Sequence, residues 1–192
     1  MSPDDALCES CGAAVLTLGN TQRGACLAPF VYGGVVREAL LDLKFGGERT
    51  CVPYFADALA QYVREETRSF DCLCAVPLHP ARQKSRGFNQ SDLLADALAA
   101  RLSLPVQSDL LARLRDTPSQ RTLDHAGRQE NVQGAFAVPP GAVVQGLRIL
   151  LVDDITTTGA TLREASGMLR QAGAARVQCI AVATTVPKNA RS

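Results

Sequence analysis

Residues 150–161 have the types and the order needed to bind a phosphate beside a sugar. An apolar run leads into two acids, Asp153 and Asp154, then into hydroxyl residues and a glycine, after which a helical pattern begins. The first turn of a helix has unpaired backbone N–H groups and about half a positive charge, which favours an anion. The threonines add hydroxyl donors, and Gly159 lets the backbone approach a ligand closely.

We expect the phosphate and ribose of a phosphorylated sugar to contact Asp153, Asp154, Thr156, Thr157, Thr158, Gly159, Ala160 and Thr161. Because like charges repel, the two carboxylates should not touch the phosphate. They can instead accept hydrogen bonds from the sugar diol or hold Mg²⁺ through water. The alternative is a strand–helix turn in which Asp154 or a threonine only caps the helix.

A basic loop follows an earlier apolar run over 70–76. It contains Arg82, Lys84 and Arg86, and no acid before Asp92. Guanidinium groups suit phosphate groups because they donate two parallel hydrogen bonds to their oxygens. Arg86 is therefore the first candidate to bind an anionic ligand and Arg82 the second, whereas Lys84 is expected to be a solvated surface charge.

The stretch over 104–134 is rich in Arg, Gln, Thr and Pro and has weak periodicity, so we expect a long excursion outside the sheet core. Its candidates for contact with nucleic acid are Arg113, Arg115, Arg121 and Arg128. The alternative is a solvated loop. Because the whole chain has a formal charge of +1, any nucleic-acid contact needs a local patch.

The chain has seven cysteines, and their number and spacing bear on metal binding. Cys8 and Cys11 form a Cys-x-x-Cys knuckle, whose thiolates can hold Zn²⁺. Cys26 and Cys51 are the candidates to complete the set. Three thiolates leave a structural zinc site incomplete, so cysteines without metal are the alternative. The others lie in apolar runs and are expected to be small core residues: Cys72, Cys74 and Cys179.

The elements that must position these residues alternate between strand and helix. Apolar runs typical of buried strands occupy 70–76, 147–152 and 176–183, and helical patterns occupy 89–102 and 160–172. Earlier helical faces are formed by Val36, Leu40 and Leu43, and by Val52, Phe55, Leu59 and Tyr62. The alternation predicts an α/β fold with a parallel sheet covered on both faces, which binds ligands at the carboxyl ends of its strands.

Composition limits the remaining possibilities. A chain of 192 residues that is 46% hydrophobic and 20% charged is typical of one globular domain, here 29–192, with a small cysteine-containing appendage, 1–28. No apolar run approaches the ~18 residues of a membrane span. Residues 1–5 are acidic rather than apolar, which is not typical of a secretory signal and predicts the cytoplasm. The absence of Trp argues against a broad base-stacking platform.

The turn at 153–161 resembles the ribose-phosphate signature of type I phosphoribosyltransferases. Further motifs resemble, in order, the ComF family of competence proteins: Val31-Tyr32, Leu43-Lys44-Phe45-Gly46-Gly47, Ala75-Val76-Pro77-Leu78-His79-Pro80, Arg86-Gly87-Phe88-Asn89-Gln90, Thr117-Pro118, Arg128, Asn131 and Gly134-Ala135-Phe136. The resemblance covers about residues 30–185, and the motif at 86–90 is the one most specific to ComF proteins.

This resemblance implies a type I phosphoribosyltransferase-like parallel sheet flanked by helices, and a site for phosphoribosyl pyrophosphate (PRPP) with Mg²⁺. It puts a pyrophosphate loop at 76–80, so that Leu78 and His79 join Arg82 and Arg86 as candidates. It also implies that the excursion from 101 to 128 covers the sugar phosphate.

Two departures from the family pattern matter. Many purine-using phosphoribosyltransferases carry a carboxylate where this chain has Thr157, so the catalytic residue is unassigned and Asp153 and Asp154 are the candidates. Many ComF-type proteins carry a second Cys-x-x-Cys, whereas Arg23 and Pro29 stand where the partner of Cys26 would be.

The resemblance implies a role in natural transformation, in which the protein handles internalised single-stranded DNA beside a competence helicase and recombination-mediator proteins. Two alternatives stay open. One is an active phosphoribosyltransferase in nucleotide metabolism, and the other is a regulator that senses PRPP without turnover.

Overall fold

A parallel sheet lies at the centre of the computed structural model, which describes residues 26–65, 69–117 and 132–185. Its strands are β1 (Cys26–Leu27), β2 (Phe30–Val31), β3 (Cys72–Ala75), β6 (Arg148–Thr156) and β7 (Arg176–Thr184). They follow the order β1-β7-β6-β3, and β2 also pairs with β7. Every pairing in this sheet is parallel, which confirms the predicted fold class.

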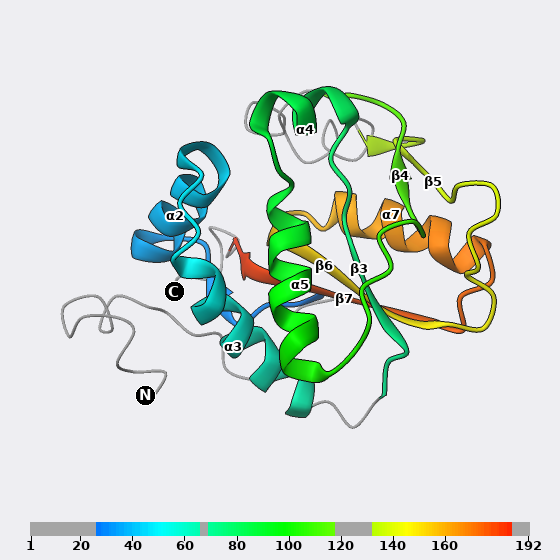
Figure 1. Cartoon of the computed structure of the whole chain (residues 1–192), viewed down its shortest axis with the longest axis horizontal. Helices are drawn as coiled ribbons and strands as arrows, with labels where there is room; N and C mark the ends of the chain where they lie inside the picture. Colours follow the sequence, from blue (N-terminus) through cyan, green and yellow to red (C-terminus); the bar gives the residue numbers. More distant parts are fainter. Residues whose placement is uncertain (1–25, 66–68, 118–131, 186–192) are drawn as a thin grey trace.

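Helices cover both faces of the sheet. They are α2 (Gly34–Leu41), the π-helical turn η2 (Asp42–Gly46), α3 (Cys51–Glu65), α4 (Pro80–Arg86), α5 (Gln90–Leu102) and α7 (Ala160–Gln171). A small antiparallel pair, β4 (Ala112–Arg113) and β5 (Phe136–Ala137), lies beside the sheet. In Figure 1, α3 and α5 lie together across the front of the sheet, and α4 lies at the end of β3.

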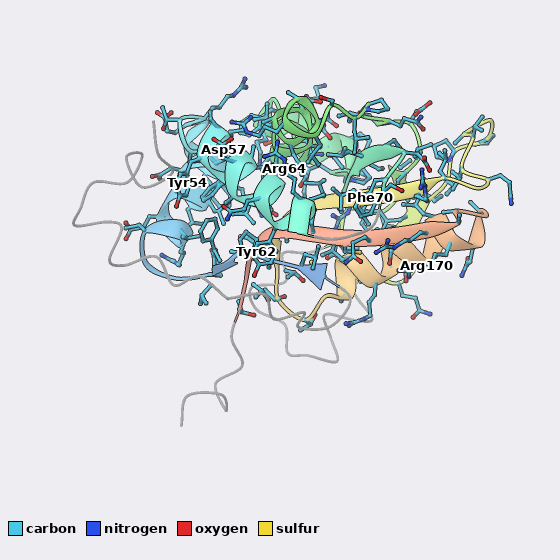
Figure 2. All side chains as sticks on the ribbon, turned by 90° about the horizontal axis from the view of Figure 1, so that it is seen from below. Tyr54, Asp57, Tyr62, Arg64, Phe70 and Arg170 are labelled. Atoms are coloured by element: carbon cyan, nitrogen blue, oxygen red, sulfur yellow. The ribbon has the colours of Figure 1, made fainter. Side chains whose placement is uncertain are left out.

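Alternate residues of each strand enter different halves of the core. Leu73 and Ala75 pack with the apolar faces of α2, α3 and α5. Cys72 and Cys74 point the other way and pack with Leu162 of α7, which confirms that these cysteines share one face as small core residues. Figure 2 shows the two layers: the helix carrying Tyr54 and Tyr62 lies above β7, and the helix carrying Arg170 lies below it.

The predicted helical faces are buried, except that Tyr62 is only partly buried. Val36, Leu40 and Leu43 are at most 3% exposed, and Phe55 and Leu59 of α3 are at most 2% exposed. Removing such side chains from water contributes ~1.5–3 kcal/mol each, which holds α2 and α3 against the sheet.

Three boundaries differ from the sequence-based expectation. Strand β6 runs on to Thr156, because β7 lies alongside and pairs Asp153 with Ala181 and Ile155 with Ala183. The two acids therefore lie in strand β6, whereas the sequence predicted a turn at these residues.

The stretch over 104–134 also differs in part from the prediction that it lies outside the core. Leu110, Leu111 and Val132 are buried, so its described ends belong to the core, contrary to the prediction for the whole of 104–134. Strand β1 pairs with β7, and the sheet therefore begins before the predicted boundary between 28 and 29. Among the described residues, no helix combines the length and the apolar character needed to cross a membrane.

Candidate functional site

A cavity of about 620 Å³ opens where β3 and β6 end, at the carboxyl edge of the sheet. Its lining includes many of the predicted site residues: Leu78, Arg82, Arg86, Arg113, Asp153, Asp154, Thr157 and Thr161. Other predicted residues lie next to this lining and not in it: His79, Thr156, Thr158, Gly159 and Ala160. Parallel α/β sheets bind ligands at this edge, so the cavity is the candidate site.

The two acids of β6 are buried in the lining of the cavity. Asp153 is 8% exposed and Asp154 is 4% exposed. The Asp153 Oδ1 atom accepts hydrogen bonds from Ser91 Oγ at 3.0 Å and from the Asp154 backbone N–H at 2.9 Å. Asp154 Oδ1 accepts from the Ile155 backbone N–H at 3.0 Å, and Asp154 Oδ2 pairs with Lys44 Nζ at 3.2 Å.

The environment of Asp153 favours its protonated form. Burial, followed by the neighbouring charge of Asp154, raises its pKa to about 7, although the backbone N–H of Asp154, the charge of Lys44 and the hydrogen bond from Ser91 act in the opposite direction. A carboxyl group with a pKa near neutrality can take up or release a proton at physiological pH, which suits it to acid–base work.

Three arginines line the same cavity as the acids. Arg82 pairs with Asp116 at 2.5 Å and also donates to the Thr117 carbonyl. Arg113 donates to Thr117 Oγ1 at 2.6 Å. Arg86 donates to the neutral side chain of Gln90, so this partner leaves its charge unbalanced. Burial lowers the pKa of Arg86 and of Arg113, but both guanidinium groups stay charged.

The motif at 86–90 ties the basic loop to α5. Asn89 caps the helix, because its Oδ1 accepts from the Ser91 backbone N–H at 3.2 Å, and its Nδ2 donates to the Val76 carbonyl at 3.1 Å. The predicted helix start at Asn89 is therefore confirmed, and a role of this motif in ligand binding stays a prediction. His79 has a capping role, since its Nδ1 accepts from the Ala81 backbone N–H at 3.3 Å.

The turn after β6 leads directly into α7. Gly159 has φ 72°, the left-handed conformation that glycine adopts without strain. Thr157 and Thr161 line the cavity. The hydroxyl of Thr158 accepts from the Ala160 backbone N–H at 3.4 Å. The helix-capping alternative and the phosphate assignment are thus compatible, and phosphate contacts by Thr156, Thr158, Gly159 and Ala160 stay predictions.

The candidate nucleic-acid residues do not form one group in the described structure. Arg113 lies in the cavity, and Arg115 donates to the Gln133 carbonyl at 2.6 Å. Arg121 and Arg128 lie outside the described residues. A basic nucleic-acid patch in this stretch stays a prediction.

The candidate zinc ligands are also divided. Cys26 packs against the cluster that contains α7, and Cys51 packs against the cluster on the other face of the sheet. Cys8 and Cys11 lie outside the described residues. Within the described ranges no three metal-ligating side chains come together, and the zinc site stays a prediction.

Two residues of the site had no role assigned from the sequence. Lys44 and Ser91 reach the acids from positions 110 and 62 residues away in the chain. Lys44 belongs to a motif of the ComF resemblance, and this was the signal that could have identified it. Ser91 follows such a motif directly.

Known proteins support the assignment of the domain. The family model "Phosphoribosyl transferase domain" matches residues 89–192, more than half of the chain. The DNA utilization protein YhgH of Salmonella typhi is 38% identical over 142 residues, which cover 71% of this chain and 62% of that protein. Competence protein F of Haemophilus influenzae is 38% identical over 112 residues, which cover 56% of this chain and 48% of that protein.

A solved structure, the glutamine PRPP amidotransferase of Bacillus subtilis, aligns with a TM-score of 0.46 and 26% identity, over 68% of this chain and 26% of that chain. The chain spans less than two thirds of the length of either sequence relative. The chain therefore belongs to the phosphoribosyl transferase domain family, and its domain is of the ComF type.

Proposed function

We propose that the cavity binds PRPP together with Mg²⁺. The observation that carries this proposal is that one cavity is lined both by two buried carboxylates, Asp153 and Asp154, and by three arginines, Arg82, Arg86 and Arg113. PRPP has the matching chemistry, since its diol needs acceptors and its pyrophosphate needs donors with positive charge.

Each part of the ligand has suitable partners in the described residues. The diol would donate to Asp154, and the pyrophosphate would accept from Arg86 and Arg82. The 5′-phosphate would lie at the start of α7, beside Thr157 and Thr161, where the helix dipole favours an anion.

The donor set also fits Mg²⁺, because this ion prefers carboxylate and phosphate oxygens and keeps several waters. Asp153 and Asp154 would hold it through water. When bound, the ion would neutralise part of the pyrophosphate charge.

Titration calorimetry of the full chain with PRPP and Mg²⁺ tests the proposal. We expect binding by the parent protein and a loss of at least about tenfold in affinity for Arg86→Gln, because hydrogen bonds to charged groups contribute ~1.5–3 kcal/mol. The matched control is Lys84→Gln, which removes an exposed charge of the same helix outside the cavity lining. Absence of binding, or equal weakening by both variants, would count against the proposal.

Whether PRPP is consumed is a separate question. The raised pKa of Asp153 supports a transfer reaction in which the ionised form of this side chain accepts the proton of an incoming nucleophile. Release of pyrophosphate from PRPP, measured with a panel of nucleobases, would support an active phosphoribosyltransferase. Binding without release for any acceptor would favour the PRPP-sensing regulator.

A role in DNA handling is the second proposal, and it is supported by the names of the relatives, a DNA utilization protein and a competence protein. On this proposal the protein acts on internalised single-stranded DNA in the cytoplasm with a helicase and recombination mediators. The test is single-strand binding as a function of salt concentration. We expect weak, salt-sensitive binding, and a slope near zero would exclude phosphate contacts.

A further inference from the structure

Lys44 reaches the acid pair from a distant part of the chain. It lies in the π-helical turn η2, which follows α2, ends at Gly46 and is capped by Gly47 with φ 70°. Its Nζ lies 3.2 Å from Asp154 Oδ2, and its side chain is 27% exposed while that of Asp154 is 6% exposed. Short π-helical segments are frequent at functional sites, and this one places a cation on the wall of the cavity.

The neighbours of Lys44 keep this turn beside the basic loop. The guanidinium of Arg86 lies 5.5 Å from the ring centre of Phe45, the next residue of η2. Phe45 and Leu41 line the cavity together with Lys44. The ammonium group is therefore held in the cavity lining, in contact with Asp154.

The ion pair compensates the charge of the buried Asp154 carboxylate. A buried carboxylate is costly unless a charge or several donors compensate it. Among the described residues, Asp154 forms an ion pair with Lys44 through its Oδ2 atom and accepts from the backbone N–H of Ile155 through its Oδ1 atom. Lys44 thus supplies the positive charge that a metal ion would otherwise supply.

The same pair conflicts with a ligand that brings its own cation. A Mg²⁺ complex held near Asp154 would put two positive charges on one carboxylate. Lys44 can leave more easily than the acid can, because its ammonium is on a flexible four-carbon stem and is partly exposed.

We propose that Lys44 is the resident counter-ion of Asp154 and that it sets the Mg²⁺ dependence of ligand binding in this cavity. Without metal, its charge lets an anionic ligand approach the acids. With metal, it moves aside and is no longer needed. Lys44 is on this view a positioning residue, and the inference rests on the proposed binding of PRPP.

Calorimetry with PRPP, in EDTA and in saturating Mg²⁺, tests this role. For Lys44→Met we expect affinity to fall about tenfold in EDTA, a value between those of exposed and buried ion pairs. In saturating Mg²⁺ we expect equal or tighter binding than in the parent, with half-saturation at several-fold lower Mg²⁺. Lys44→Arg should restore metal-free binding, and Lys84→Met, which removes an exposed lysine outside the cavity lining, should change neither condition. Equal weakening of Lys44→Met in both conditions would overturn the inference, because damage to the fold does not depend on metal.

Thermal unfolding with Mg²⁺ alone provides a readout without PRPP. Lys44→Met should unfold at lower temperature than the parent in EDTA and should be stabilised more than the parent by Mg²⁺. An equal response of both proteins to Mg²⁺ would overturn the role of Lys44, even if the parent binds PRPP. If the parent bound no PRPP with or without Mg²⁺, the proposed function would fail, while the unfolding measurement would still decide whether Lys44 is the counter-ion.

Discussion

Replacing Asp153 by asparagine should stabilise the protein at neutral pH. Asparagine has the shape of a protonated aspartic acid and keeps an oxygen that can accept from Ser91 Oγ and from the Asp154 backbone N–H. It carries no charge to be desolvated. The parent must instead either hold a proton on Asp153 or bury a second carboxylate beside Asp154.

The size and sign of the effect follow from the pKa of Asp153. Burial, followed by the charge of Asp154, raises this pKa from 3.8 to about 7 in the folded protein, which corresponds to up to about 4 kcal/mol. Below the pKa of the unfolded chain both states hold the proton, and the contribution to stability is fully present. It is lost as the pH rises through the folded pKa, so the parent becomes less stable than Asp153→Asn as the pH increases.

Urea unfolding in EDTA, at about pH 5 and about pH 8, measures this effect. The free energy of unfolding of Asp153→Asn minus that of the parent should increase by about 3 kcal/mol from the lower to the higher pH. Asp96→Asn, which removes an exposed carboxylate from α5, serves as the matched control. A difference between parent and Asp153→Asn that does not change with pH, or that changes in favour of the parent, would refute the reasoning.

Three further predictions follow from the same contacts. Asp154→Asn should weaken PRPP binding by ~1 kcal/mol or more, because an acceptor of the diol becomes partly a donor; unchanged affinity in calorimetry would contradict the assignment. Asn89→Ala removes the cap of α5 and the bond to the Val76 carbonyl, and urea unfolding should show a loss of ~1–2 kcal/mol; a loss below a few tenths would mean that neither bond matters. Burial raises the pKa of Cys74 to about 12, so iodoacetamide near neutral pH should modify Cys74 only after unfolding; rapid labelling of the native protein, seen by peptide mass spectrometry, would show that this core opens readily.

The elements around the site could be predicted because their signals are local. The alternation of Cys72 and Cys74 predicted the face that they share, and the apolar run before Asp153 predicted β6. The end of β6 could not be predicted, since Asp153 and Ile155 stay in strand only because β7 provides partners for them. The length of a strand depends on its neighbour and not only on its own residues.

The contacts of Asp153 and Asp154 with Ser91 and Lys44 could be found only in the folded structure. Ser91 and Lys44 lie on α5 and η2, and the sheet order brings both elements to the end of β6. No local pattern reports a bond across 62 or 110 residues. Arg86 was predicted as a pyrophosphate ligand, but the bracing of its side chain by Gln90 could be recognised only in three dimensions.

A crystal structure of the protein grown with PRPP and Mg²⁺ would test the central claim most directly. The account predicts the sugar in the cavity at the end of β6, with its diol within hydrogen-bond distance of Asp154, its pyrophosphate beside Arg86, and Lys44 turned away from the acid. A fully occupied PRPP bound elsewhere, with the Lys44–Asp154 pair intact and the cavity filled by water, would contradict it.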